Sequence, residues 1–244
     1  DSFSSGTGAI VIGGDDSAPN GATALYPVTW GYVEGPDGGK YRQSVATGNG
    51  AVVVGVHSQA LSQGSTAVGV AATAGDNGEA KTTANITTPT AAIEATSVGA
   101  LARAKNIRSS AVGYSANASG NYSTVVGANT TANGTSSLAV GHNSTANSSY
   151  SLAAGYNAVA NGENATAIGS GAATNNKDAI AIGTGAKARG NQSISIGVGN
   201  TVSGNYSGAF GDPSKVSGDG SYSIGNNNTI TSSNTFVFGS GINR

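Results

Sequence analysis

The chain has 244 residues, of which 39 are glycine, while charged residues make up only 9% and aromatic residues 6%. This composition excludes an ordinary helical domain, which needs many Leu, Glu and Lys residues to build amphipathic faces, and the glycines do not recur at every third position as collagen requires. The formal net charge of −1 excludes disorder driven by high net charge and gives no electrostatic signature for nucleic-acid binding.

The first 49 residues contain one strand-like segment, Ala9–Ile12, and otherwise show no regular pattern. The polar start, Asp1–Gly8, predicts no signal peptide, and no apolar stretch approaches the roughly 20 residues of a membrane-spanning helix. We therefore expect residues 1–49 to form an irregular N-terminal cap or tip with one isolated repeat-like strand, ahead of a repetitive domain over residues 50–244.

Residues 14–49 hold the only Trp and three of the nine tyrosines of the chain. Tyr, Trp and Arg dominate the energetics of binding surfaces, which makes this segment a candidate ligand-binding tip. The alternative is that it covers the open end of the repetitive domain, and the two roles can coexist. The candidate ligand-binding residues here are Tyr26, Trp30, Tyr32, Tyr41 and Arg42.

From residue 50 onward, a glycine follows a short apolar segment at intervals of 14 residues. Gly55 and Gly69 are one interval apart, and the same phase then runs without a break from Gly99 to Gly239. Between them an insertion at about residues 75–95 interrupts the repeat. It is predicted to be a lateral loop, which either carries recognition or has no role of its own.

Counted from this glycine, the residue one before it is mostly β-branched or aromatic, and the residue three before it is often large and apolar. Both are predicted to face the core from one side of a strand. A second core position lies five after the glycine, mostly Ala but Val202, Val216 and Ile230 near the C-terminus. A polar Asn-Gly or Ser-Gly turn follows in several copies. Each copy is therefore predicted to form one coil of a parallel β-solenoid, made of strand, turn, strand and turn.

The residue two before the glycine is small and uncharged in every copy, and by strand alternation it is predicted to point away from the core. A solvent-exposed strand would normally carry charges, and a thin core of Ala and Val needs support from other chains. We infer self-association through this face, with the number of chains left open, while the polar position four after the glycine meets water. The predicted interface residues are Val53, Ala67, Ala111, Val125, Ala139, Ala153, Ala167, Ala181, Ser195 and Ala209.

Two segments, Asn164–Gly169 and Asp178–Gly183, resemble the Asn-Ser-Val-Ala-Ile-Gly-type repeat of YadA-like head domains, which belong to trimeric autotransporter adhesins of Gram-negative bacteria. The resemblance covers about Gly50–Gly239. It implies an all-β fold: a left-handed parallel β-roll of 14-residue repeats, assembled as a homotrimer. The handedness rests on the resemblance alone, because general crossover rules favour the right hand. The resemblance also implies an extracellular head fragment, displayed on a stalk above an outer-membrane anchor.

The function implied by the resemblance is adhesion through multivalent trimeric binding to host cells, to an extracellular-matrix protein or glycan, or to another bacterial cell. One alternative is a purely structural spacer of a surface fibre. A remote one is an ice-binding solenoid, whose threonine column would here be broken by cations such as Lys187. The cations Arg103, Lys105 and Arg108 are further ligand-binding candidates, for an anionic partner, or else an ordinary solvated surface.

Catalysis is not expected. The only histidines, His57 and His142, are predicted to be exposed turn residues, and no paired carboxylates or nucleophile–base set is visible. The sequence has no cysteine, which excludes disulfides and thiolate metal sites. We expect no metal, no cofactor, no nucleic-acid partner and no direct membrane insertion by this fragment.

Overall fold

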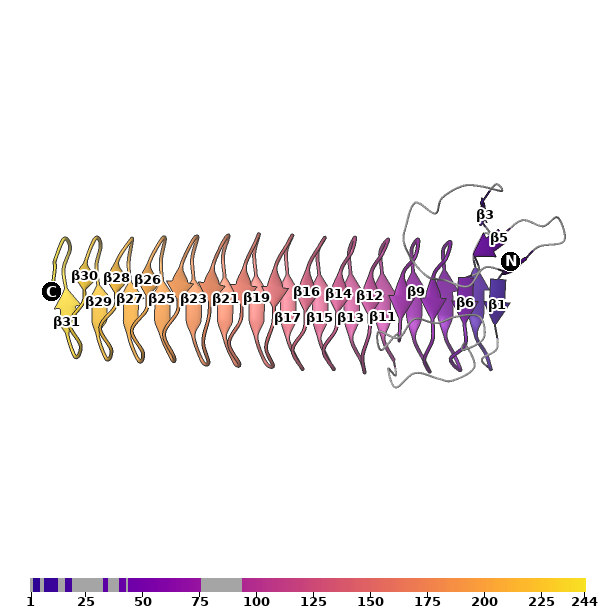
Figure 1. The fold of residues 1–244 in the computed structure, drawn as a ribbon, viewed down its shortest axis with the longest axis horizontal. Helices are drawn as coiled ribbons and strands as arrows, with labels where there is room; N and C mark the ends of the chain where they lie inside the picture. Colours follow the sequence, from indigo (N-terminus) through magenta and orange to yellow (C-terminus); the bar gives the residue numbers. More distant parts are fainter. Residues whose placement is uncertain are drawn as a thin grey trace. The chain divides into compact units, whose positions relative to one another are not determined.

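The structure is a computed structural model that describes residues 2–4, 7–12, 16–18, 33–34, 40–42, 44–75 and 94–244. Every regular element in these residues is a β-strand of two or three residues, and none of them belongs to a helix that could cross a membrane. The chain divides into two compact units, Asp1–Tyr122 and Ser123–Arg244. Each unit is a parallel β-solenoid in which strands of two sheets, A and B, alternate along the chain (Figure 1).

In its described residues, the first unit has five strands of sheet B, six strands of sheet A and a small third sheet, C. Its sheet B strands are β2 (Ile10–Ile12), β7 (Val52–Val54), β9 (Thr66–Val68), β11 (Thr96–Val98) and β13 (Ser110–Val112). Its sheet A strands are β1 (Ser2–Ser4), β6 (Ser44–Ala46), β8 (Gln59–Ala60), β10 (Thr73–Ala74), β12 (Arg103–Ala104) and β14 (Asn117–Ala118). Sheet C is antiparallel and comprises β3 (Asp16–Ala18), β5 (Lys40–Arg42) and β4 (Val33–Glu34).

The second unit repeats the same alternation without an insertion. Its sheet B strands are β15 (Thr124–Val126), β17 (Leu138–Val140), β19 (Leu152–Ala154), β21 (Thr166–Ile168), β23 (Ile180–Ile182), β25 (Ile194–Ile196), β27 (Gly208–Phe210), β29 (Tyr222–Ile224) and β31 (Phe236–Phe238). Its sheet A strands are β16 (Thr131–Ala132), β18 (Thr145–Ala146), β20 (Val159–Ala160), β22 (Ala173–Thr174), β24 (Lys187–Ala188), β26 (Thr201–Val202), β28 (Lys215–Val216) and β30 (Thr229–Ile230).

The strand register confirms the 14-residue period. Within the second unit each strand pairs in parallel with the strand 14 residues later, as in Ile168↔Ile182↔Ile196. In the first unit β9 pairs directly with β11, Thr66 opposite Thr96, although these residues are separated by one repeat plus the insertion. The insertion therefore does not shift the register in which successive coils pair.

The solenoid begins before residue 50, so the predicted domain boundary is placed too late. Strand β2 pairs with β7, Val11 opposite Val53, and β1 pairs with β6, Phe3 opposite Val45. Strand β1 therefore belongs to sheet A and strand β2 to sheet B, like the strands of the later coils. Ala9–Ile12 looks isolated in the sequence because the 14-residue spacing is absent between it and Val52.

The structure overturns the predicted assignment of the two faces of sheet B. The side chains two before the glycine form the core, whereas the larger residues one and three before it face outward. The physical reason is the short distance between the two sheets of one coil, which leaves room only for Ala, Ser or Val. The ten predicted interface residues are all fully buried within a single chain and have no surface to offer another: Val53, Ala67, Ala111, Val125, Ala139, Ala153, Ala167, Ala181, Ser195 and Ala209.

On sheet A, the predicted core position five after the glycine is confirmed. It is fully buried from Ala60 to Ile230, and the position four after the glycine is partly or fully exposed except at Gln59 and Thr73. The position three after the glycine is also buried, which the sequence analysis missed because several members are polar. Their polar groups are satisfied internally: Asn228 Nδ2 donates to Gly239 O at 2.7 Å.

The recurring glycine is required by both space and backbone conformation. At Gly183 φ is +126°, and an added Cβ would lie 2.2 Å from the carbonyl oxygen of Gly197 in the next coil. Side chains are rarely compatible with this conformation. The same close approach recurs from coil to coil, which explains why the glycine phase is so strict.

Candidate binding surfaces

The outer face of sheet B carries an apolar stripe in each unit, made of the residues one and three before the recurring glycine. In the second unit its exposed members include Val126, Leu138, Ile168, Ile182, Tyr222, Ile224, Phe236 and Phe238. In the first unit they include Ile10, Ile12, Val98 and Val112. These side chains lie in register on successive strands, so their apolar surfaces adjoin.

The apolar stripe contains no charged residue at any of its positions within the described part of the chain. Thr and Ser are its only polar members apart from Tyr222. A single exposed apolar side chain is ordinary, but a contiguous exposed apolar surface marks a site of association. The stripe is therefore the candidate surface for association among the described residues. It lies on the predicted strands, but on the opposite face from the predicted interface residues.

The N-terminal ligand-binding candidates can be placed only in part. Tyr41 and Arg42 belong to β5, where Tyr41 pairs with Ser17 of β3 and with Val33 of β4. Tyr26, Trp30 and Tyr32 lie outside the described residues. The use of this segment as a cap or a binding tip therefore stays a prediction.

The three cations proposed as one patch are divided between two places. Arg103 and Lys105 line a groove on sheet A. Arg108 does not line it, and its Nε donates to Glu94 Oε2 at 2.6 Å in an exposed ion pair. The hydrogen bond and the charge of Glu94 raise the pKa of Arg108 above its ordinary value, so this guanidinium stays charged.

The groove on sheet A, called the cationic groove below, has a volume of about 360 Å³ and lies within the first unit. Its floor comprises Thr73, Arg103 and Asn117, which are paired in register on β10, β12 and β14. The turn residues two after the glycine form one wall, and Lys105 completes the lining. The wall residues are Ala71, Leu101 and Ser115.

Exposed aromatic side chains occur at the turns of the coils and are not among the predicted site residues. His142 stacks on Tyr156 of the next coil, with ring centroids 5.6 Å apart and an interplanar angle of 11°. Tyr150 and Tyr206 are exposed at another turn position and have a positive φ. Their positions follow the 14-residue period, which could have identified them.

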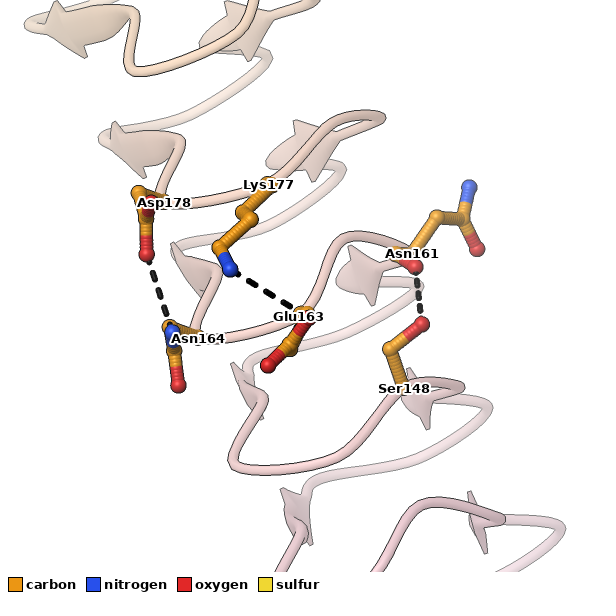
Figure 2. Close-up of polar contacts among 6 residues, drawn as sticks. All are labelled: Ser148, Asn161, Glu163, Asn164, Lys177 and Asp178. Atoms are coloured by element: carbon orange, nitrogen blue, oxygen red, sulfur yellow. Dashed lines mark hydrogen bonds and ion pairs between the residues drawn. The ribbon is translucent and has the colours of Figure 1, made fainter.

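The polar turns are held by contacts between equivalent residues of neighbouring coils. Figure 2 shows Asn164 Nδ2 donating to Asp178 Oδ1 at 3.0 Å and Lys177 Nζ lying 3.5 Å from Glu163 Oε2. An asparagine ladder continues this pattern, in which Asn147 accepts from Asn133 at 2.9 Å. Because these groups bond to one another, their main effect is to order the turns.

Nothing in the described residues forms a cluster of three or more His, Cys, Asp or Glu side chains that could hold a metal ion. His142 is exposed, as predicted, but His57 is half-buried, so the prediction for His57 is wrong.

Comparison with known families gives one match, to the model described as YadA head domain repeat (2 copies). It matches residues 46–72, 104–130, 132–158, 149–172, 160–186, 175–200 and 188–212. These segments together cover more than half of the chain and fall on the coils described above. A comparison with curated proteins finds no match.

Proposed function

Because the chain belongs to the YadA head domain family, we propose that it is the head of a bacterial cell-surface adhesin that binds its target as a homotrimer. In this arrangement sheet B of each chain packs against its sister chains, and the turns and sheet A remain available for a target. The target is a host-cell surface, an extracellular-matrix protein or glycan, or another bacterial cell. The protein is displayed outside the cell and anchored at the outer membrane.

The observation that supports the trimer most directly is the apolar stripe. Ile168, Ile182 and Ile224 are each more than a third exposed in the single chain and carry side chains that water solvates poorly. Sister chains would cover this surface along its length. Sheet A offers a contrasting face, because its outward position holds Arg103, Lys187 and Lys215 and is suited to solvent.

A second observation favours association over a solitary chain. The interior of each coil is filled mostly by Ala and Ser, with Val at some positions and one Ile near the C-terminal end. Such a core buries little apolar surface per residue, and small cores commonly depend on oligomerisation for stability. Covering the stripe supplies the apolar burial that the interior of one chain lacks.

Trimer formation also gives the binding mechanism. Three identical chains present three copies of each surface on a common scaffold, and simultaneous engagement raises avidity about 10²–10⁴-fold over one site when the geometry permits it. A weak individual site is then sufficient for firm attachment.

The experiment is binding of the purified chain to immobilised matrix proteins and cultured cells, in parallel with an Ile182→Glu variant designed to separate the chains. We expect the wild type to adhere and the separated variant to lose most of its apparent affinity. A folded, trimeric wild type that adheres to no surface would contradict the adhesin proposal and favour a structural spacer. A third arm, with residues 16–42 replaced by a short Gly-Ser linker, tests whether the N-terminal segment contributes.

A further inference from the structure

We propose that the cationic groove of the first unit binds the anionic group of an acidic saccharide. This inference rests on the proposed adhesin function and specifies one of its binding sites. The groove lies on sheet A, away from the apolar stripe of sheet B, so it would remain accessible in the proposed trimer.

The two cations are placed on the same side of the coil by strand alternation. Arg103 is on β12, and Lys105 follows it by two residues, which returns the side chain to the same face. Arg103 lies in register between Thr73 and Asn117 of the neighbouring coils. The two charges therefore lie beside the carboxamide of Asn117, which also lines the groove and is partly exposed.

The lining suits an acidic sugar. A guanidinium can bond a sulfate or carboxylate through two parallel N–H groups, and an ammonium adds a second charge-assisted contact. Ser115 and Asn117 are partly exposed and can bond sugar hydroxyl groups, and Leu101 offers an apolar wall to the C–H face of the ring. The volume of about 360 Å³ falls within the usual range for small-ligand sites.

Neither cation is free in the protein, because Arg103 and Lys105 each already make an interaction within the chain. A bound anion would add to that interaction or displace it. Such a competition predicts modest affinity for a monovalent ligand and a larger gain from multivalent presentation.

The second unit supplies a matched control. Lys187 and Arg189 occupy the positions equivalent to Arg103 and Lys105, with both side chains exposed. The turn residue equivalent to Leu101 is Gly185, which has no side chain to form a wall. The two pairs carry the same charge. If removing one pair weakens ligand binding more than removing the other, the cause is therefore the groove and not the net charge.

The test is isothermal titration calorimetry of the 244-residue chain with three tetrasaccharides: a sulfated heparin fragment, a carboxylated hyaluronan fragment and neutral chitotetraose. We expect the acidic probes to bind and the neutral one not to bind, and the comparison of the two acidic probes identifies the preferred anion. The double variant Arg103→Ala/Lys105→Ala should weaken binding about tenfold or more, whereas Lys187→Ala/Arg189→Ala should change it less than about twofold. Leu101→Gly should weaken it without changing the charge.

Equal losses in the two double variants would overturn the proposal, because they would show that net charge alone attracts the probe. Absence of binding by the wild type to either acidic probe would overturn it as well. Circular dichroism of each variant confirms that the coil is intact. If the wild type adheres to cells but binds neither acidic probe, this inference fails while the adhesin function stands. Loss of adhesion to every surface would instead count against the adhesin function.

Discussion

Ala181 and Ile182 are neighbours in the chain and lie on opposite sides of β23: Ala181 is fully buried, whereas Ile182 is 36% exposed. The smaller side chain fills the interior of the coil and the larger one faces outward. This reverses the usual relation between size and burial. The alternation of buried and outward-facing side chains holds along both units, and it identifies the residues available for contact with another chain.

A glutamate at Ala181 should prevent folding, whereas a glutamate at Ile182 should prevent association of folded chains. Ala181→Glu places a carboxylate in a core without space or partners, so the chain should unfold or aggregate. Ile182→Glu places the charge on an exposed surface of the single chain, so the coil should fold but fail to associate. Circular dichroism and light scattering measure the two outcomes. A trimeric, folded Ile182→Glu variant would show that the stripe is not the interface.

The recurring glycine should tolerate no side chain. Gly183→Ala would bring a Cβ within 2.2 Å of a carbonyl oxygen and force a strained φ, at an expected cost of about 2–4 kcal/mol. Gly171→Ala is the matched control, because nothing lies within 4 Å of its added Cβ and Ala71 adopts a similar φ of 54° at the equivalent position. It should cost about 1 kcal/mol. Urea denaturation measures both, and equal costs would contradict the account of the glycine column.

Ile230, the largest fully buried side chain among the described residues, should contribute substantially to the stability of the C-terminal coils. It packs in a cluster with Val202, Ala209, Val216 and Val237. Ile230→Ala should lower the free energy of unfolding by about 2–5 kcal/mol. The neighbouring Thr229→Ala, on the outer side of the same strand, should change it by less than about 0.5 kcal/mol. Thermal unfolding of the two variants tests this contrast.

The ion pair between Arg108 and Glu94 should matter little for stability, because both side chains are exposed. The raised pKa of Arg108 means that the guanidinium keeps its charge at neutral and mildly alkaline pH, and its contribution is lost on the alkaline side only as the pH rises through this raised pKa. Arg108→Ala should therefore leave the melting temperature nearly unchanged from pH 5 to pH 9. A pH-dependent loss of stability in this range would contradict this assignment.

The solenoid could be predicted from sequence because its main constraint is local and periodic. A glycine that meets the next coil at the same point cannot be replaced, so residues such as Gly169, Gly183 and Gly197 mark every turn. The core position at Ala188, Val202 and Val216 could also be predicted from the sequence, since these small apolar residues recur once per coil.

The face of sheet B was not predictable from residue size alone. Hydropathy favoured Ile182 over Ala181 for the interior, but the close approach of two sheets within one coil excludes the larger side chain. The cationic groove was likewise hidden, because it depends on the register of Thr73, Arg103 and Asn117 across the insertion. The pairing of Arg108 with Glu94 also depends on stacking of successive coils, which separated it from the two groove cations.

The mass of the native protein in solution tests the central claim most directly. Sedimentation equilibrium of the wild-type chain should give three times the 23.5 kDa of a single chain, and Ile182→Glu should reduce it to one. A folded wild-type protein with the mass of one chain at every concentration measured would contradict the proposal that sister chains cover the apolar stripe.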